Sequence, residues 1–237
     1  MLSSRKQAIL KAVVEEYTRT AEPVGSELLS EKYRFGVSPA TIRTQLSELA
    51  EEGYLMQPHT SAGRVPTDRG YRFYVNTLMQ ERELKVPEKE TLRRELFGEE
   101  VEMEAHLRHA VQLAARMSRS LAIGGLFHRP QRFRAGLAEL FSYPEFYEHE
   151  TAFQVARMID ELDRHFEKLV EALENGEPKV YIGRENPLGV RDVSLLVSGY
   201  RLGGELPGFL ALIGPTRMEY ARNLSLMEYM TRLLNRL

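Results

Sequence analysis

The chain has 237 residues, enough for two small domains, and its hydrophobic (43%) and charged (28%) contents are ordinary for a globular protein. It has no cysteine, which excludes disulfides, thiol nucleophiles and cysteine-based zinc sites. No apolar run reaches about 18 residues, so we expect no membrane span, and residues 1–10 lack the apolar segment of a signal peptide. These features predict a cytoplasmic protein.

The N-terminal part of the chain predicts two short helices before residue 34. Ser4 and Gln7 form a capping-box pattern at the start of the first helix, which carries apolar residues along one side. A second helix is expected over residues 26–33, after a breaker that contains Pro23 and Gly25. A turn through residues 35–37 leads into a third helix, so the order is that of a helix-turn-helix.

The third predicted helix has two chemically different faces. Ser38 suits its N-cap, Pro39 suits its first position, and Gly53 can end it because glycine adopts positive φ. One face is an apolar stripe, Ile42, Leu46 and Leu49. The opposite face carries small or donor-bearing side chains, which let a helix approach base edges, and an arginine such as Arg43 can bond guanine with two hydrogen bonds. The alternative is an ordinary surface helix, which the surrounding elements disfavour.

A basic, glycine-containing hairpin follows this helix. Two short strands, at residues 54–56 and 64–65, flank a wing over residues 57–64, in which Gly63 permits a tight turn. Arg64 and the hydroxyls of the wing offer contacts to phosphate or to the minor groove. His59 is interpreted as a polar loop residue, because no carboxylate or second ligand lies nearby for a metal or acid–base role. Together these elements predict a winged helix-turn-helix domain over residues 1–80.

The net charge of −2 means that a DNA-binding face must be created by segregating charges. Five cations are candidates for that side of the domain: Lys6, Lys32, Arg43, Arg64 and Arg69. The full set of predicted DNA-contacting residues comprises Ser38, Ala40, Thr41, Arg43, Thr44, Ser47, His59, Thr60, Ser61 and Arg64.

The middle of the chain predicts helices joined by a linker. A fourth helix is expected over 67–80, a linker with Pro87 over 81–90, and an amphipathic helix over 88–119 that Gly98 could break. His106 and His109 stand at i, i+3, which suits a metal, but no third ligand is evident and a solvated helix face is favoured. A helix over 149–174 is expected further on.

The C-terminal part predicts an antiparallel sheet with helices. Strands are expected over 122–127, 179–183, 193–200 and 206–213, with a hairpin turn at Gly203 and Gly204. A final helix is expected to start at Gly214–Thr216. Arg217 either holds an anion at that helix start or anchors the loop at Glu185–Asn186 through a salt bridge, and the second reading is favoured. Residues 91–237 are thus a second, sheet-containing domain.

Long motifs in both parts resemble one known family. They are VGSELLSEKY, GVSPATIR, ELAEEGYL, QPHTSAGRVPTDRGYRFYV, YIGRENP and IGPTRMEYAR. They resemble the heat-inducible transcription repressor HrcA, densely over residues 1–79 and again over about 178–237. The resemblance implies a bacterial repressor that binds an inverted-repeat operator, CIRCE, as a homodimer. It also implies that the GroEL chaperonin keeps the repressor active.

One departure from the family concerns its second domain. The resemblance implies a GAF-like domain that carries an inserted dimerisation domain, and members are usually longer. Here residues 122–127 resemble the first strand of that region and are followed almost directly by residues 141–146, which the family places after the insertion. We therefore expect an α+β chain with a reduced GAF-like domain that lacks most of the insertion, which puts the usual dimer interface in question.

Enzymatic function is disfavoured by the motifs. The sequence has no Gly-x-Ser-x-Gly, His-Glu-x-x-His or P-loop, so no catalytic residues, metal site or cofactor are predicted. The leading hypothesis is a DNA-binding repressor with double-stranded DNA as its partner. The alternative is a winged-helix regulator whose GAF-like domain senses a small molecule.

Overall fold

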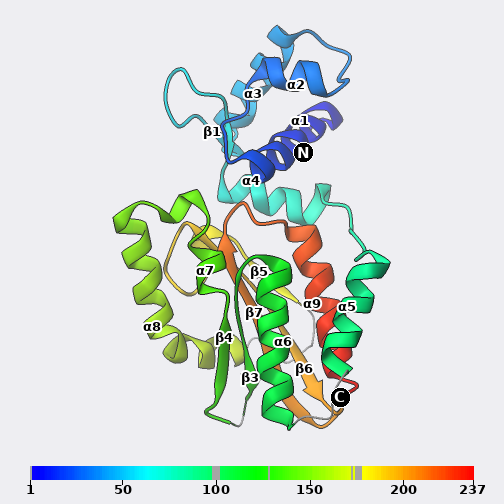
Figure 1. The fold of residues 1–237 in the computed structure, drawn as a ribbon. Helices are drawn as coiled ribbons and strands as arrows, with labels where there is room; N and C mark the ends of the chain where they lie inside the picture. Colours follow the sequence, from blue (N-terminus) through cyan, green and yellow to red (C-terminus); the bar gives the residue numbers. More distant parts are fainter. Residues whose placement is uncertain (1, 98–101, 128, 172, 174–177) are drawn as a thin grey trace. The chain divides into compact units, whose positions relative to one another are not determined.

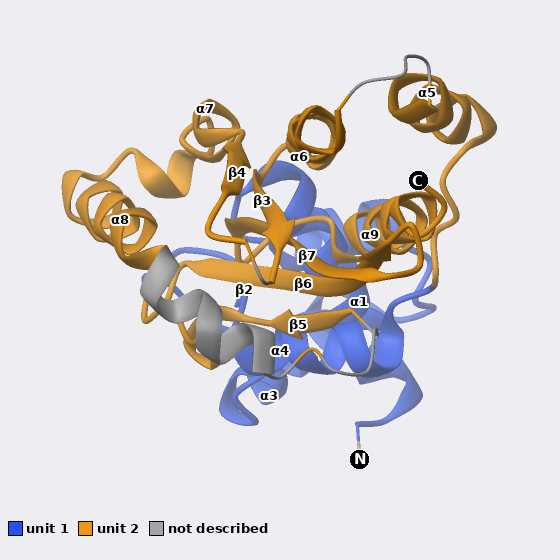
Figure 2. Ribbon diagram, turned by 90° about the horizontal axis from the view of Figure 1, so that it is seen from below, with its two compact units in different colours: residues 1–80 blue, residues 81–237 orange. Residues whose placement is uncertain are grey.

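The computed structural model describes residues 2–97, 102–127, 129–171, 173 and 178–237. The chain divides into two compact units, Met1–Gln80 and Glu81–Leu237, which Figure 2 shows in blue and orange.

Unit 1 is a helical domain with a small hairpin (Figure 1). Its elements are α1 (Ser4–Thr20), α2 (Ser26–Lys32), α3 (Pro39–Glu51), β1 (Leu55–Met56), β2 (Val65–Pro66), α4 (Asp68–Phe73) and a π-helical segment (Tyr74–Leu78). The strands β1 and β2 are antiparallel. The core is apolar and drawn from the four α-helices, and it includes Ile9, Val13, Leu29, Ile42, Leu49 and Tyr71. These elements confirm the predicted winged helix-turn-helix order.

The start of α1 differs from the capping box expected at Ser4. Ser3 is the N-cap, and its side chain accepts a hydrogen bond from the backbone N–H of Lys6 at 3.3 Å. The Gln7 side chain donates to the carbonyl oxygen of Leu2 at 3.0 Å, so it does not close a box with Ser4. The helix therefore begins one residue after the cap that satisfies its first free N–H groups.

Unit 2 contains a five-stranded antiparallel sheet in the order β4-β3-β7-β6-β5. The strands are β3 (Leu121–Leu126), β4 (Arg132–Ala135), β5 (Lys179–Tyr181), β6 (Val193–Leu202) and β7 (Leu206–Pro215). The long pair β6–β7 turns at Gly203 and Gly204, whose φ values of 61° and 80° match the predicted hairpin turn. This arrangement, with the helices around it, confirms the α+β class.

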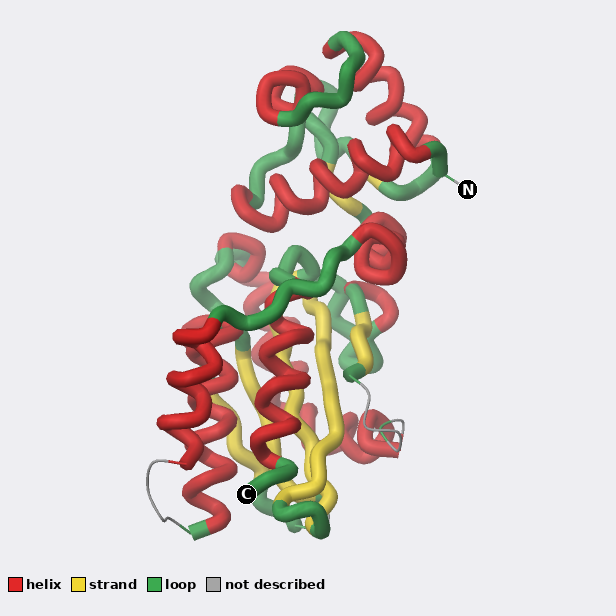
Figure 3. Tube along the Cα trace, turned by 90° about the vertical axis from the view of Figure 1, so that its right-hand side faces the viewer, coloured by secondary structure: helices red, strands yellow, loops and turns green. Residues whose placement is uncertain are grey.

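Helices cover both faces of this sheet. They are α5 (Val86–Phe97), α6 (Met103–Ser118), α7 (Leu137–Leu140), α8 (His149–Glu171) and α9 (Tyr220–Leu234), with 3-10 turns at Pro144–Phe146 and Gly183–Glu185. Figure 2 shows α6 and α9 on one side and α7 and α8 on the other, and α9 runs alongside the strands in Figure 3. Consecutive strand residues such as Leu195 and Leu196 point to opposite faces of the sheet, and both are buried because helices cover each face.

Two expectations for this unit need correction, whereas the break allowed within residues 88–119 agrees with the two helices found there. The predicted linker 81–90 is shorter, because α5 already begins at Val86 and Leu84 is buried. The helix expected over 88–119 is two helices, α5 and α6, and Gly98, the expected break, lies outside the described residues. The last helix begins at Tyr220, several residues after the predicted start, because residues 214 and 215 still belong to strand β7 and residues 216–217 form a turn.

Strand β4 was not expected from the sequence. Its neighbour β3 packs closely against α6 because of Gly124. A Cβ on Gly124 would lie 2.8 Å from the Val111 side chain of α6 and 3.1 Å from the Phe209 carbonyl. The glycine therefore permits α6 to approach the sheet closely. The paired glycines of this strand serve packing, in agreement with the absence of a nucleotide-binding pattern.

Candidate nucleic-acid interface

Helix α3 presents one buried and one exposed face. Ile42, Leu46 and Leu49 are buried, while Ala40, Arg43 and Thr44 are exposed. This is the division predicted from the helical period. It leaves a helix anchored by its apolar stripe with a polar surface available to a partner.

The hydroxyl groups at the start of α3 are used within the helix. Ser38 Oγ accepts from the backbone N–H of Thr41 at 3.3 Å and lies 3.0 Å from the Thr41 hydroxyl. Thr44 donates to the Ala40 carbonyl at 3.2 Å. These bonds fix the first turn and occupy its hydroxyl groups. Arg43 is the long donor side chain on this face, and it forms no ion pair within the described residues.

An open groove of about 390 Å³ separates α3 from the wing. Arg43 and Ser47 of α3 line it together with Thr60, Ser61 and Arg64 of the wing. The structure thus brings five of the ten predicted residues into one groove. The others, Ser38, Ala40, Thr41, Thr44 and His59, are exposed or half-buried nearby in the sequence but do not line it.

Ser26, Glu27 and Gln57 also line the groove and were not predicted. Gln57 orders the wing, because its side-chain amide donates to the carbonyls of Thr60 and Ala62, both at 2.9 Å. Gln57 was visible in the sequence as the first residue of the wing, but its amide could not be assigned to two carbonyls without the loop geometry.

Arg64 joins the wing to the segment that precedes α2. Its backbone N–H and carbonyl pair with those of Val24, both at 2.9 Å. Its side-chain Nε is buried without a hydrogen-bond partner in the described part of the chain. Arg64 also lines the groove between α3 and the wing, and a guanidinium there suits an anionic acceptor, because it forms strong charge-assisted hydrogen bonds.

Gly63 is required for a different reason from the one predicted. Its φ is not positive. Instead, an added Cβ would lie 2.5 Å from the carbonyl carbon and oxygen of Val24 and 2.8 Å from the Pro23 carbonyl carbon. Glycine is therefore needed for the close approach of two backbones.

Three of the five cations proposed for the DNA side are engaged within unit 1. Lys6 pairs with Glu48 at 2.8 Å and Glu52 at 2.6 Å. Lys32 pairs with Glu16 at 2.5 Å, and the Arg69 guanidinium lies 4.5 Å from the centre of the Tyr54 ring. Of the five proposed cations, Arg43 and Arg64 are the two that line the groove.

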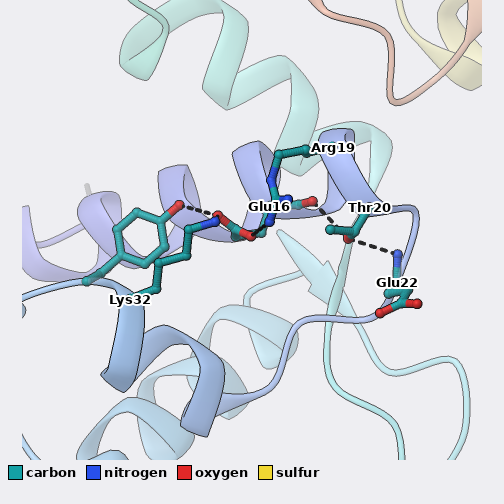
Figure 4. A network of polar contacts seen from close by, with 6 residues as sticks. Glu16, Arg19, Thr20, Glu22 and Lys32 are labelled. Carbon is teal, nitrogen blue, oxygen red and sulfur yellow. Dashed lines mark hydrogen bonds and ion pairs between the residues drawn. The ribbon is translucent and has the colours of Figure 1, made fainter.

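Glu16 is a buried carboxylate that ties α1 to α2 (Figure 4). It accepts from Lys32 and Arg19 at 2.5 Å each and from the Tyr33 hydroxyl at 2.7 Å. Burial would raise the pKa of Glu16, but the hydrogen bonds from Lys32, Tyr33 and Arg19 outweigh it and lower this pKa to about 2. The network fixes the end of α2, and hence the turn that leads into α3.

Two further sequence hypotheses concerned unit 2. Arg217 pairs with Glu145 through two hydrogen bonds, one of them at 3.1 Å, and the sequence did not indicate this partner. The salt bridge expected with the loop at Glu185–Asn186 stays a prediction. Asn186 is buried and its side-chain amide donates to three backbone carbonyls. The sequence could not identify Glu145, because 72 residues separate it from Arg217.

The described residues contain no group of histidine and acidic side chains able to hold a metal ion. His109 lies 3.4 Å from Glu95, which also receives Arg116 at 2.5 Å. Within the same residues, none of the helices is long and apolar enough to cross a membrane.

A helix-turn-helix followed by a two-stranded wing defines unit 1 as a winged-helix domain, the module of many transcription regulators. The family model of the HrcA protein C-terminal domain matches residues 70–224. The chain therefore belongs to the HrcA family, a family of transcription repressors rather than enzymes.

Individual relatives agree with this assignment. The heat-inducible transcription repressor HrcA of Desulforamulus reducens is 28% identical over 335 aligned positions, which cover 99% of this chain and 96% of that protein. The HrcA of Pelotomaculum thermopropionicum is 56% identical over 94 residues, 40% of this chain and 27% of that protein. Because the first alignment spans 335 positions and this chain has 237 residues, a large block of the relative has no counterpart here.

A solved structure has the same fold. It is described as a hypothetical protein at 2.2 Å resolution, and it superposes with a TM-score of 0.81 at 21% identity. The match covers 99% of this chain and 98% of that chain.

Proposed function

We propose that the chain is a sequence-specific DNA-binding repressor of heat-shock genes that recognises an inverted repeat of the CIRCE type as a homodimer. The groove between α3 and the wing carries this proposal, because it gathers Arg43, Arg64 and four hydroxyl-bearing residues. Arg43 is suited to base edges, since it lies on the exposed face of α3. Arg64 is suited to phosphate or the minor groove, since it belongs to the wing.

Titration of labelled inverted-repeat DNA tests these two roles. Arg43→Ala should weaken binding by about 1–3 kcal/mol and relax specificity at one base position. Arg64→Ala should weaken binding to all duplexes and reduce the salt slope by about 1. Arg5→Ala, an exposed arginine of α1 outside the groove, is the matched control and should change neither. Unaltered specificity in Arg43→Ala would remove the assignment of α3 as the base-reading element.

Regulation by the GroEL chaperonin is the second part of the proposal. It is supported by membership of the HrcA family and not by a contact within the chain. Purified GroEL should increase the fraction of operator bound, and GroEL loaded with unfolded protein should not. If neither form changes operator binding by the active repressor, chaperonin control does not apply to this chain.

A small-molecule sensor remains a second candidate because unit 2 has a cavity of about 1170 Å³ at the β6–β7 turn. Tyr200, Arg201, Glu228 and Arg232 are among its lining residues, which gives it both charge signs. A ligand of this cavity should raise the melting temperature and shift operator affinity reciprocally. If no compound in a metabolite screen has these two effects, the cavity is not an effector site.

A further inference from the structure

The C-terminal ends of α5 and α9 form an apolar groove with an arginine rim. The groove holds about 430 Å³ and is lined by Arg93, Arg94, Phe97, Leu233 and Arg236. Phe97 is 46% exposed, and the buried Leu233 also lines the groove. The exposed Phe97 ring beside the arginines provides an apolar contact for a partner.

The rim of this groove retains positive charge. Among the described residues, no carboxylate pairs with Arg93, Arg94 or Arg236. Arg93 is oriented by the Tyr229 ring, whose centre lies 5.9 Å from its guanidinium. The rim therefore attracts anionic groups while its central floor is apolar.

The groove walls are held in place by contacts away from the rim. Arg222 of α9 pairs with Glu88 of α5 at 3.1 Å. Arg116 of α6 pairs with Glu95 of α5 at 2.5 Å, and Leu92 and Leu96 are buried on the inner face of α5. These contacts fix α5 against α6 and α9, so the groove exists before a partner binds.

We infer that this groove docks an acidic, amphipathic helix of a partner protein, with an aliphatic anchor over Phe97 and flanking carboxylates on the arginines. Helices bind grooves through apolar anchors at i, i+3 and i+4 spacing, and arginine beside an aromatic residue is typical of protein interfaces. A nucleic-acid backbone would use the cations but leave Phe97 without a role. The surface lies in unit 2 and is independent of the DNA-binding proposal for unit 1.

Fluorescence anisotropy with the full chain tests this inference. The probe is a fluorescein-labelled helical peptide with a leucine anchor flanked by glutamates one turn away on each side. Arg93→Glu combined with Arg94→Glu should weaken peptide binding at least about tenfold, and Phe97→Ala should weaken it about tenfold. Phe97→Leu should restore most of the affinity, since it keeps an apolar floor.

Arg191→Glu is the matched control, because Arg191 is an exposed arginine of the same unit in the loop before β6. It should leave peptide binding unchanged, and all variants should keep their melting temperature and operator affinity. Undetectable peptide binding would overturn the inference. Binding unaffected by Phe97→Ala, or equal displacement by inorganic polyphosphate, would overturn it in favour of a purely anionic ligand. A change of mass in solution in the arginine variants would instead identify a second copy as the occupant.

Discussion

Arg43 and Arg64 line one groove from two different elements, whereas Lys6, Lys32 and Arg69 are engaged by other side chains of unit 1. Lys6 pairs with Glu48 in the last turns of α3 and with Glu52, the C-cap of that helix. The sequence identified all of these charges, but it could not pair residues that are more than 40 positions apart. The sequence could predict which face of α3 is exposed, since the helical period of its apolar residues alone decides this.

Gly63 gives the sharpest residue-scale prediction. Gly63→Ala should destabilise the chain by about 1–3 kcal/mol and weaken operator binding, because its Cβ would meet the Val24 backbone and displace the wing. Urea unfolding and DNA titration measure the two effects. Gly25→Ala, at a glycine with open space around its Cβ, is the control for stability and should cost less than about 1 kcal/mol. Equal stabilities of the two variants would show that the wing does not depend on this close approach.

At the scale of elements, the position of α2 depends on one buried carboxylate. Glu16 on α1 bonds Lys32 and Tyr33 at the end of α2, two residues ahead of the turn into α3. The sequence predicts both helices from caps and breakers. It does not predict this network, because a glutamate in an amphipathic helix is normally solvent-exposed.

The Glu16 network predicts a pH dependence of stability. The pKa of Glu16 falls from 4.5 to about 2 on folding, so its contribution is present above pH 4.5 and is lost as the pH falls toward 2. The contribution is at most about 3 kcal/mol. Urea unfolding of the full chain between pH 2 and 5 measures it. Glu16→Gln should flatten this dependence, whereas Glu22→Gln, at an exposed carboxylate, should not. A steep, unchanged dependence in Glu16→Gln would exclude Glu16 as its source.

At the scale of the whole molecule, the missing block relative to longer HrcA proteins bears on pairing. The predicted sheet strands of unit 2 are all present, and β4 adds one more. The sequence predicted the long strands well, but not β4, whose Arg132–Ala135 segment alternates arginine with apolar residues over only four positions, too few for the period to stand out. Unit 2 thus contains the five-stranded sheet and lacks a counterpart of about 100 aligned positions of the longer HrcA relative.

Pairing on DNA follows from the proposed inverted-repeat operator. We predict that two copies bind one repeat, because two-fold symmetric half-sites match a dimer and the second contact becomes intramolecular. Mass photometry of the complex counts the copies. Replacing one half-site by a shuffled sequence is the control and should reduce the affinity steeply. A single copy on the intact repeat would contradict the dimeric model while leaving DNA recognition by unit 1 intact.

The most direct test of the account compares two duplexes of equal length and composition at one salt concentration. One carries the inverted repeat and the other is its shuffled version. If α3 and the wing recognise sequence, the intact chain should bind the repeat at least about 10³-fold more tightly. Arg43→Ala should narrow this ratio toward the non-specific level. Equal affinities of the wild-type chain for both duplexes would contradict the central claim that this groove is a sequence-specific DNA-binding site.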